Sequence, residues 1–172
     1  MMSNNPCHLN QVSNRNFLSI GGFQLVLNRC RKVDFLCNKA NLPGLSMGSA
    51  RQSSYLRDIP VPGDKIQYED LRVDFIVDEN MENYHQIYNW MRELGYPEDL
   101  GQSKLDNRSD ATLLILNSSL QVSGKVKFRD VFPVSLEGIP FNATIQDQQY
   151  FTATAVFKYT MFDLMDIDGK EV

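Results

Sequence analysis

Residues that could support catalysis are few in this chain. Its two histidines, His8 and His85, lie far apart in the sequence. Adjacent carboxylates such as Glu69 and Asp70 would point to opposite faces of a strand, so they cannot form an acid–base dyad. The chain contains no H-E-x-x-H metalloprotease motif. We therefore predict that the protein is not an enzyme and has no catalytic residues.

Patterns that hold a metal ion or a cofactor are also missing. Three cysteines, Cys7, Cys30 and Cys37, form an odd and sparse set without the paired spacing of a zinc site. We expect them to be free thiols in a reducing compartment. Asp166 and Asp168 resemble the start of a calcium loop, but the full twelve-residue pattern is absent. The sequence predicts no metal site, no cofactor-binding residues and no cofactor.

Composition is that of an ordinary globular domain. The chain has 172 residues, of which 42% are hydrophobic and 22% charged, and this length suits one domain. No apolar run approaches the roughly 18 residues that a membrane span needs, so we predict no membrane partner. A formal net charge of -4 argues against a protein that grips nucleic-acid phosphates.

The charges are segregated along the chain. Residues 1–57 contain seven Lys or Arg and one acid, whereas residues 58–111 contain five basic and thirteen acidic residues. This separation predicts a molecule with opposed charged surfaces, which would favour head-to-tail contacts between copies.

The elements that must carry any site are mainly strands. Alternating patterns predict strands over 23–30, 33–38, 71–78, 112–117, 121–129 and 150–162, with a hairpin turn at Arg31-Lys32 and a bend or edge at 132–136. One helix is predicted over 81–94, with Asn80 as its N-cap. Its apolar face should contain Tyr84, Ile87, Tyr88, Met91 and Leu94. These elements predict a mainly β fold, a β-sandwich or barrel with one flanking α-helix.

Residues 45–64 form an unusual stretch between the predicted strands. Pro60 and Pro62 cannot sit in a central strand, because each removes a hydrogen-bond donor. We therefore expect a long, extended and exposed excursion that contacts a neighbouring molecule. Its predicted anchors are Tyr55, Leu56 and Ile59, and its predicted cationic donors are Arg51 and Arg57. The predicted acceptors on a neighbouring subunit are Asp58, Asp64, Glu69 and Asp70.

Several segments resemble, in their order and spacing, the tail tube family of contractile-tailed, T4-like phages, including its baseplate tube-initiator relatives. The segments are Val33-Asp-Phe-Leu-Cys-Asn-Lys-Ala-Asn-Leu-Pro-Gly, Ile59-Pro-Val-Pro-Gly-Asp, Val73-Asp-Phe-Ile-Val-Asp-Glu-Asn, Ile87-Tyr-Asn-Trp-Met and the strand from Phe151 to Tyr159. The resemblance covers residues 17–163. It implies a single tail-tube-like β domain there. The sequence departs from the family pattern in its Asn-rich residues 1–16, which we expect to form a flexible N-terminal arm, and in an acidic C-terminal tail over 164–172.

The resemblance also implies a function. Six copies would form a ring, and stacked rings would form the inner tail tube or its baseplate-proximal start. DNA would pass through the lumen without specific binding, and the partners would be other copies and the tail sheath or baseplate proteins. The location would be the virion tail, after assembly in the host cytoplasm. The position within the tail stays open between tube subunit, baseplate initiator and end cap. The alternative function is a small β-sandwich module that binds carbohydrate or peptide.

Overall fold

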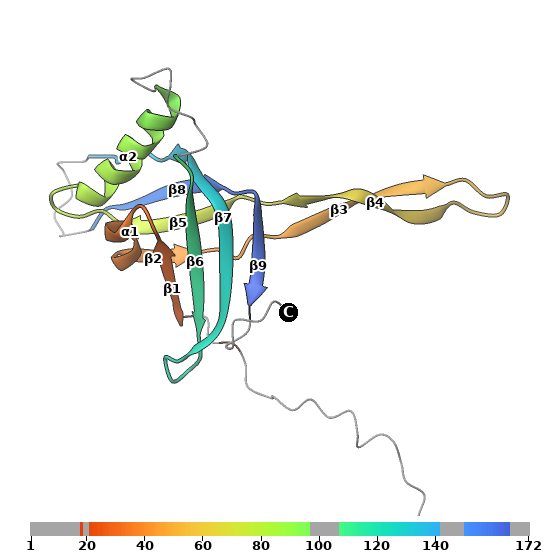
Figure 1. Ribbon diagram of the computed structural model, residues 1–172, viewed down its shortest axis with the longest axis horizontal. Helices are drawn as coiled ribbons and strands as arrows, with labels where there is room; N and C mark the ends of the chain where they lie inside the picture. The colour runs from red at the N-terminus through yellow and green to blue at the C-terminus, as the bar shows by residue number, and fades with distance from the viewer. Residues whose placement is uncertain (1–17, 19–20, 97–106, 142–149, 166–172) are drawn as a thin grey trace, which may run out of the picture.

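The described part of the chain folds into a mainly β body with one long projection (Figure 1). The computed structural model describes residues 18, 21–96, 107–141 and 150–165, which contain nine strands and two helices. The predicted N-terminal arm lies outside the described residues, as does most of the predicted C-terminal tail. All strand pairs are antiparallel.

Two layers make up the body, and the long strand β7 belongs to both. One layer has the order β1-β6-β7-β9 and the other has the order β7-β8-β5-β2. The strands are β1 Phe23–Leu27, β2 Cys37–Ala40, β5 Leu71–Ile76, β6 Ser109–Leu116, β7 Val122–Leu136, β8 Thr152–Lys158 and β9 Met161–Met165. The predicted β-sandwich with a flanking helix is confirmed.

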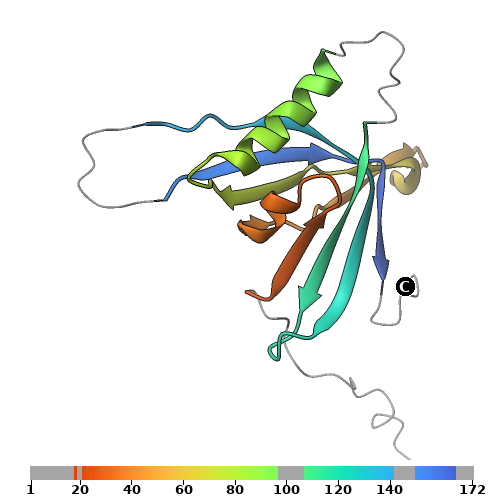
Figure 2. The ribbon, with the colours of Figure 1, turned by 60° about the vertical axis from the view of Figure 1, so that its left-hand side comes forward.

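Strand β7 changes layers through a bulge. Asp130 has a φ of 56°, and the register with β6 shifts beside it. A short polar residue tolerates this left-handed conformation, and a bulge bends the strand that contains it. Figure 2 shows β7 curving from one layer into the other. Residues 132–136 were predicted to form a bend or an edge, and they form the edge of the second layer, where they pair with β8 and the register shifts between Pro133 and Ser135.

The last predicted strand is divided in two. Residues 150–162 were expected to form one strand, but β8 ends at Lys158 and β9 begins at Met161. The two pair with different parts of β7, so the chain changes layers between them. β9 runs to Met165, two residues beyond the predicted end of the domain.

The core lies between the two layers. It contains residues from both inner faces, each less than 5% exposed, and these include Leu25, Leu27, Leu71, Val73, Phe75, Leu113, Val126, Phe128, Ala153, Ala155 and Phe157. Alternation in β5 places Leu71, Val73 and Phe75 inward, as predicted from the sequence. In β8, Ala153, Ala155 and Phe157 likewise point inward.

Helix α2 closes one end of this core, over Glu82–Gly95. Ile87 and Trp90 are buried to 1% exposure or less, and the Trp90 ring lies 6.1 Å from the ring of Phe157. The predicted helix and the burial of Ile87 are confirmed. The prediction that Tyr88 lies on the buried face was wrong, because its side chain is 50% exposed. The buried face is rotated toward Asn83, Ile87 and Trp90.

The start of α2 is held by a buried side chain rather than by a cap. Asn80 was predicted as the N-cap, but Met81 occupies that position with a φ of 55° and without a side-chain hydrogen bond. Asn83, which is fully buried, donates to the Ile76 carbonyl at 2.8 Å. Its Oδ1 accepts from the backbone N–H of Asp78 at 3.3 Å. Asn83 therefore ties the end of β5 to the first turn of α2.

The segment after β1 is helical where a strand was expected. Residues Arg31–Phe35 form helix α1, so the predicted hairpin turn at Arg31-Lys32 and the strand beginning at Val33 were wrong there. Val33 is buried, and the carboxylate of Asp34 accepts from the backbone N–H of Leu27 at 2.7 Å. This contact folds one helical turn back onto the end of β1. Strand β2 begins only at Cys37.

Asp34 should make folding stability depend on pH. Burial raises the pKa of this carboxyl to about 6, against the lowering effects of the Leu27 N–H and Arg31. Ionisation is therefore disfavoured in the folded state, and the stability that the neutral group supports is lost as pH rises from about 4 to about 6. Asp34→Asn retains an acceptor oxygen without the charge.

We expect Asp34→Asn to stabilise the fold at pH 7 by about 1 kcal/mol, a value reduced for the partial exposure of this group. At pH 4 the two proteins should be equally stable. Denaturant unfolding at both pH values measures the difference. A variant that is less stable than the wild type at pH 7 would contradict this account of Asp34.

Candidate assembly interface

A long β-hairpin projects from the body of the protein. It consists of β3, Leu45–Gln52, and β4, Ile59–Tyr68, which pair only with each other within the described residues. Every residue of β3 is exposed, and so is every residue of β4 except Gly63. The expected extended and exposed excursion is confirmed, although it is a paired ribbon. A two-stranded ribbon alone in water is marginally stable, so this hairpin needs a covering surface.

The hairpin exposes apolar side chains in two clusters. Near the body, Leu45 lies opposite Tyr68 and Met47 lies opposite Ile66, so all four side chains share one face. Their exposed fractions are 57%, 37%, 55% and 50%. Nearer the tip, Ala50, Gln52, Ile59 and Val61 share a face, while Pro60 and Pro62 lie on the other. Clusters of exposed apolar side chains of this kind are typical of a protein–protein contact.

A bulge with two glycines separates these clusters. The register shifts between Met47 and Ser49, and Gly48 and Gly63 face each other at this point. A Cβ on Gly63 would lie 2.6 Å from the carbonyl oxygen of Gly48. The two backbones can approach this closely only because residue 63 has no side chain.

Gly63→Ala should alter the direction of the outer half of the hairpin. We expect it to raise the concentration needed for self-assembly about tenfold or more, equivalent to about 1.4 kcal/mol, with the melting temperature of the body unchanged. Gly48→Ala is the matched control, because a Cβ there meets no atom within 4 Å. Sedimentation velocity over a dilution series measures the effect. Equal assembly by both variants would show that the close approach of Gly48 and Gly63 has no role in assembly.

Most of the predicted interface residues lie on the outer half of this hairpin. Tyr55 and Leu56 are at its tip, with exposed fractions of 102% and 90%. Arg51 lies on β3, and Arg57 and Asp58 lie between the tip and β4. Among the described residues, none of these three charged side chains has an ion-pair partner. Ile59 and Asp64 lie on β4 and are exposed. The role of these residues in assembly stays a prediction.

Glu69 and Asp70 lie at the base of the hairpin, where they help to hold it. The Glu69 carboxylate accepts from the backbone N–H of Gly44 at 3.3 Å. The Glu69 carbonyl accepts from the Tyr159 hydroxyl at 2.8 Å, and Lys158 lies 4.0 Å from the Asp70 carboxylate. These two residues therefore help to hold the base of the hairpin within the chain, and their role as acceptors for a neighbouring subunit stays a prediction.

Aromatic rings complete this base, which the sequence analysis did not identify. The Tyr68 ring packs edge-on against Tyr159 and Phe162, with centroids 5.9 and 5.7 Å away. Phe162 and Tyr159 in turn contact Phe128 in the core. Burial raises the pKa of Tyr159 to about 12, so its hydroxyl keeps its proton and its hydrogen bond at neutral pH. The hairpin is thus attached to the core through side chains from three strands.

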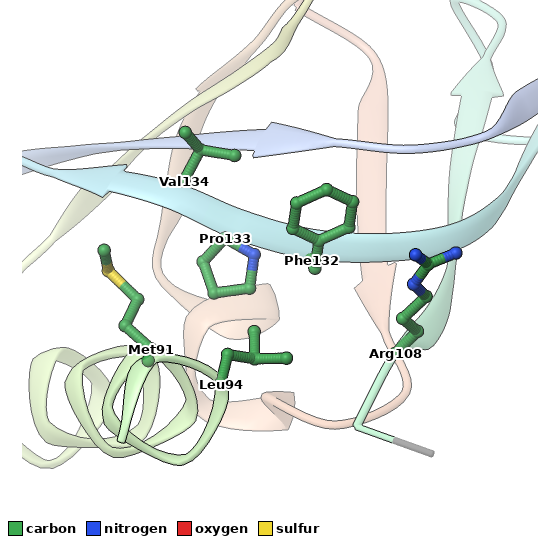
Figure 3. A pocket seen from close by; sticks show the side chains of 7 residues that line it. Met91, Leu94, Arg108, Phe132, Pro133 and Val134 are labelled. Carbon is green, nitrogen blue, oxygen red and sulfur yellow. The ribbon is translucent and has the colours of Figure 1, made fainter. Parts of the chain in front are cut away.

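An apolar pocket of about 360 Å³ lies between α2 and β7 (Figure 3). Met91 and Leu94 on the helix approach Pro133 on the strand. The Arg108 guanidinium carbon lies 5.5 Å from the centre of the Phe132 ring. Arg108 is the one titratable group in the lining, so the pocket offers a surface for packing rather than acid–base chemistry.

The described residues contain no arrangement suited to catalysis. Gly44 to Gly48 has the spacing Gly-x-Ser-x-Gly, but Ser46 lies within an extended strand rather than at a strand-to-helix turn. The described ranges hold no group of three or more His, Cys, Asp or Glu side chains that could bind a metal ion. Burial raises the pKa of both Cys30 and Cys37 to about 11, so these free thiols are poor nucleophiles at neutral pH.

Among the described residues, no helix is both long enough and apolar enough to cross a membrane.

Comparison with known proteins assigns the family. Residues 8–165 match the family described as phage tail tube protein. The chain belongs to this family. The resemblance noted in the sequence is thereby confirmed, and the chain is a structural protein of the tail tube or tube-terminator type. Tube proteins of this kind are parts of the phage tail.

Individual relatives agree with this assignment. The chain is 30% identical over 113 residues to the tail tube terminator protein of Enterobacteria phage T4. This match covers 63% of the chain, which spans 62% of the length of that relative. Two solved structures share the fold, at 13–14% identity. The tube-terminating cap of the anti-feeding prophage gives a TM-score of 0.64, with 92% of this chain and 97% of that chain covered. The sheath/tube terminator of the PVC injection system gives 0.65, with 87% and 97% covered.

Proposed function

We propose that six copies of this protein form a ring at the end of the tail tube, coaxial with its lumen. The observation that carries the proposal is the β3–β4 hairpin, whose exposed apolar clusters need a neighbouring molecule to cover them. The end position, rather than a repeating position along the tube, is supported by the 30% identity with the T4 terminator. The protein would assemble in the host cytoplasm and become part of the virion tail, in contact with the tube and sheath or baseplate proteins.

Unpaired strand edges support a ring as well. Within the described residues, β1 pairs only with β6, and β9 pairs only with β7. Met161 and Leu164 on β9 are 38% and 47% exposed. Exposed edges invite pairing with another chain, and a closed ring satisfies all of them at once.

DNA would pass through this ring without being held. The chain has a formal net charge of -4, so a ring of copies repels phosphate overall. At about 0.15 M salt we expect no binding to double-stranded DNA in a mobility-shift assay, because few phosphate contacts would form. The alternative carbohydrate-binding module finds no support at Trp90, whose ring is 1% exposed and cannot stack on a sugar.

Native mass spectrometry of the purified protein tests the proposal. We expect a species with six times the mass of the chain and no series of larger oligomers. Extended tubes of the protein alone would contradict the end position and indicate a repeating tube subunit. A monomer across the concentration range would contradict the ring itself.

A further inference from the structure

We infer that the hairpin tip of one copy inserts Tyr55 and Leu56 into a pocket at the opposite end of the body of the next copy. This inference rests on the proposed function and assigns the receiving surface. The pocket lies beyond the C-terminal end of β5 and is distinct from the pocket between α2 and β7. Its lining includes Val77, Asp78, Glu79, Phe141 and Phe151.

The hairpin does not bury the apolar side chains at its own tip. Tyr55 and Leu56 are almost fully exposed, and β4 alone has ten residues, which extend about 33 Å at the usual rise per residue. Figure 1 shows the hairpin leaving the body and pointing away from it. A large aromatic and an aliphatic side chain at such a tip suit insertion into a pocket on another molecule.

The receiving pocket has a mainly apolar lining that also includes two acidic residues. Its volume is about 360 Å³, and the rings of Phe141 and Phe151 pack at 5.5 Å within its lining. The acidic residues are Asp78 and Glu79, and their carboxylates have no ion-pair partner among the described residues. The backbone at Asp78 is held in place, because Asn83 accepts from the Asp78 N–H and donates to the carbonyl of Ile76.

Charge distinguishes this pocket from the one between α2 and β7. Arg57 follows the inserted Leu56 directly, and Arg51 lies on the adjacent strand. In the pocket beyond β5 these two cations would face Asp78 and Glu79. In the pocket of Figure 3, which has the same volume, they would face Arg108. Opposite charges guide register and partner choice, whereas like charges oppose binding.

The positions of tip and pocket fit a head-to-tail contact. The hairpin joins β5 at Leu71, and the pocket begins just after the other end of that strand, at Val77. Donor and acceptor surfaces therefore lie at opposite ends of one body. A contact between unlike surfaces repeats from copy to copy and closes into a ring when the rotation allows.

Cross-linking in the full-length protein tests the contact. The test variant carries Leu56→Cys together with Glu79→Cys and is treated with a short bifunctional thiol cross-linker. We expect a covalent ladder on a denaturing gel, extending to six copies. Each single variant is a control for cross-linking through the native cysteines. After treatment it should run mostly as a monomer on the denaturing gel. Leu56→Cys with Gly95→Cys, which lies in the other pocket, is the matched control pair.

The outcomes separate the inference from the proposed function. A ladder from the Leu56→Cys/Glu79→Cys pair alone supports the contact. The wild-type protein could form rings while the Leu56→Cys/Glu79→Cys pair gives no ladder, or while the control pair gives an equal ladder. Either result would contradict the assignment of the receiving pocket but not the ring. A wild-type protein that is monomeric at every concentration overturns both.

Charge exchange provides a second readout. Arg57→Glu should weaken assembly at least tenfold in concentration, and adding Glu79→Arg to the same chain should restore most of it. The rescue should decline as salt rises toward 1 M, where the Debye length is about 3 Å. Failure of Glu79→Arg to rescue Arg57→Glu would contradict the pairing.

Discussion

Replacing residues 49–62 with a short Gly/Ser turn is expected to leave a folded body that no longer assembles. The change removes the outer half of the hairpin beyond the Gly48–Gly63 bulge and retains the anchored base. Because Tyr55 and Leu56 are almost fully exposed, their loss should not lower the free energy of unfolding of the body. We expect assembly to require at least a hundredfold more protein, equivalent to about 2.7 kcal/mol.

Two measurements separate these effects. Thermal unfolding reports on the body, and sedimentation velocity over a dilution series reports on assembly. The control is Ser53→Ala with Ser54→Ala, which keeps the length of the ribbon and both apolar anchors. A truncated variant that assembles like this control would show that the hairpin is a surface insertion without a role in the ring.

Trp90→Ala should be the most destabilising single substitution in α2. The indole is 1% exposed, packs against Phe157, and donates from Nε1 to the carbonyl of Asn107 at 2.7 Å. Removing it leaves a cavity and takes away the shorter of two hydrogen bonds to the Asn107 carbonyl, which also accepts from Arg29 at 3.3 Å, and we expect a loss of about 3–5 kcal/mol. Denaturant unfolding measures this loss.

Tyr88→Ala is the control on the same helix. Its side chain is 50% exposed, so we expect a loss of less than about 1 kcal/mol. Similar losses for the two variants would contradict the orientation of α2 described above. The comparison also tests the structure against the sequence pattern, which assigned Tyr88 to the buried face.

Periodicity in the sequence was sufficient to predict an element where one pattern dominated the segment. The alternation of Leu71, Val73 and Phe75 predicted β5, and two prolines close together predicted that residues 45–64 stay outside the packed core. In α2 the spacing favoured Tyr88, but Asn83 and Trp90 occupy the buried face instead. Periodicity treats Asn as polar and solvent-facing, whereas hydrogen bonds to the end of β5 make its burial favourable.

Features that depend on distant segments could not be predicted. Helix α1 forms where Asp34 meets the N–H of Leu27, and β7 bends where Asp130 adopts a positive φ. The hydrogen bond of Asp34 joins residues only seven apart but is not part of the alternation of apolar residues, whereas Asp130 is held by contacts with the distant Asp110 and Thr160. The pocket beyond β5 combines residues near 78 with residues near 140 and 150, so only the fold reveals it.

Electron microscopy of the purified wild-type protein tests the central claim most directly, that this chain forms the rings of a tail tube end. End-on class averages should show rings with six-fold symmetry and an open central channel. In side views, the rings should be single or paired rather than stacked into long tubes. Monomeric particles, or oligomers without a central channel, would contradict the account.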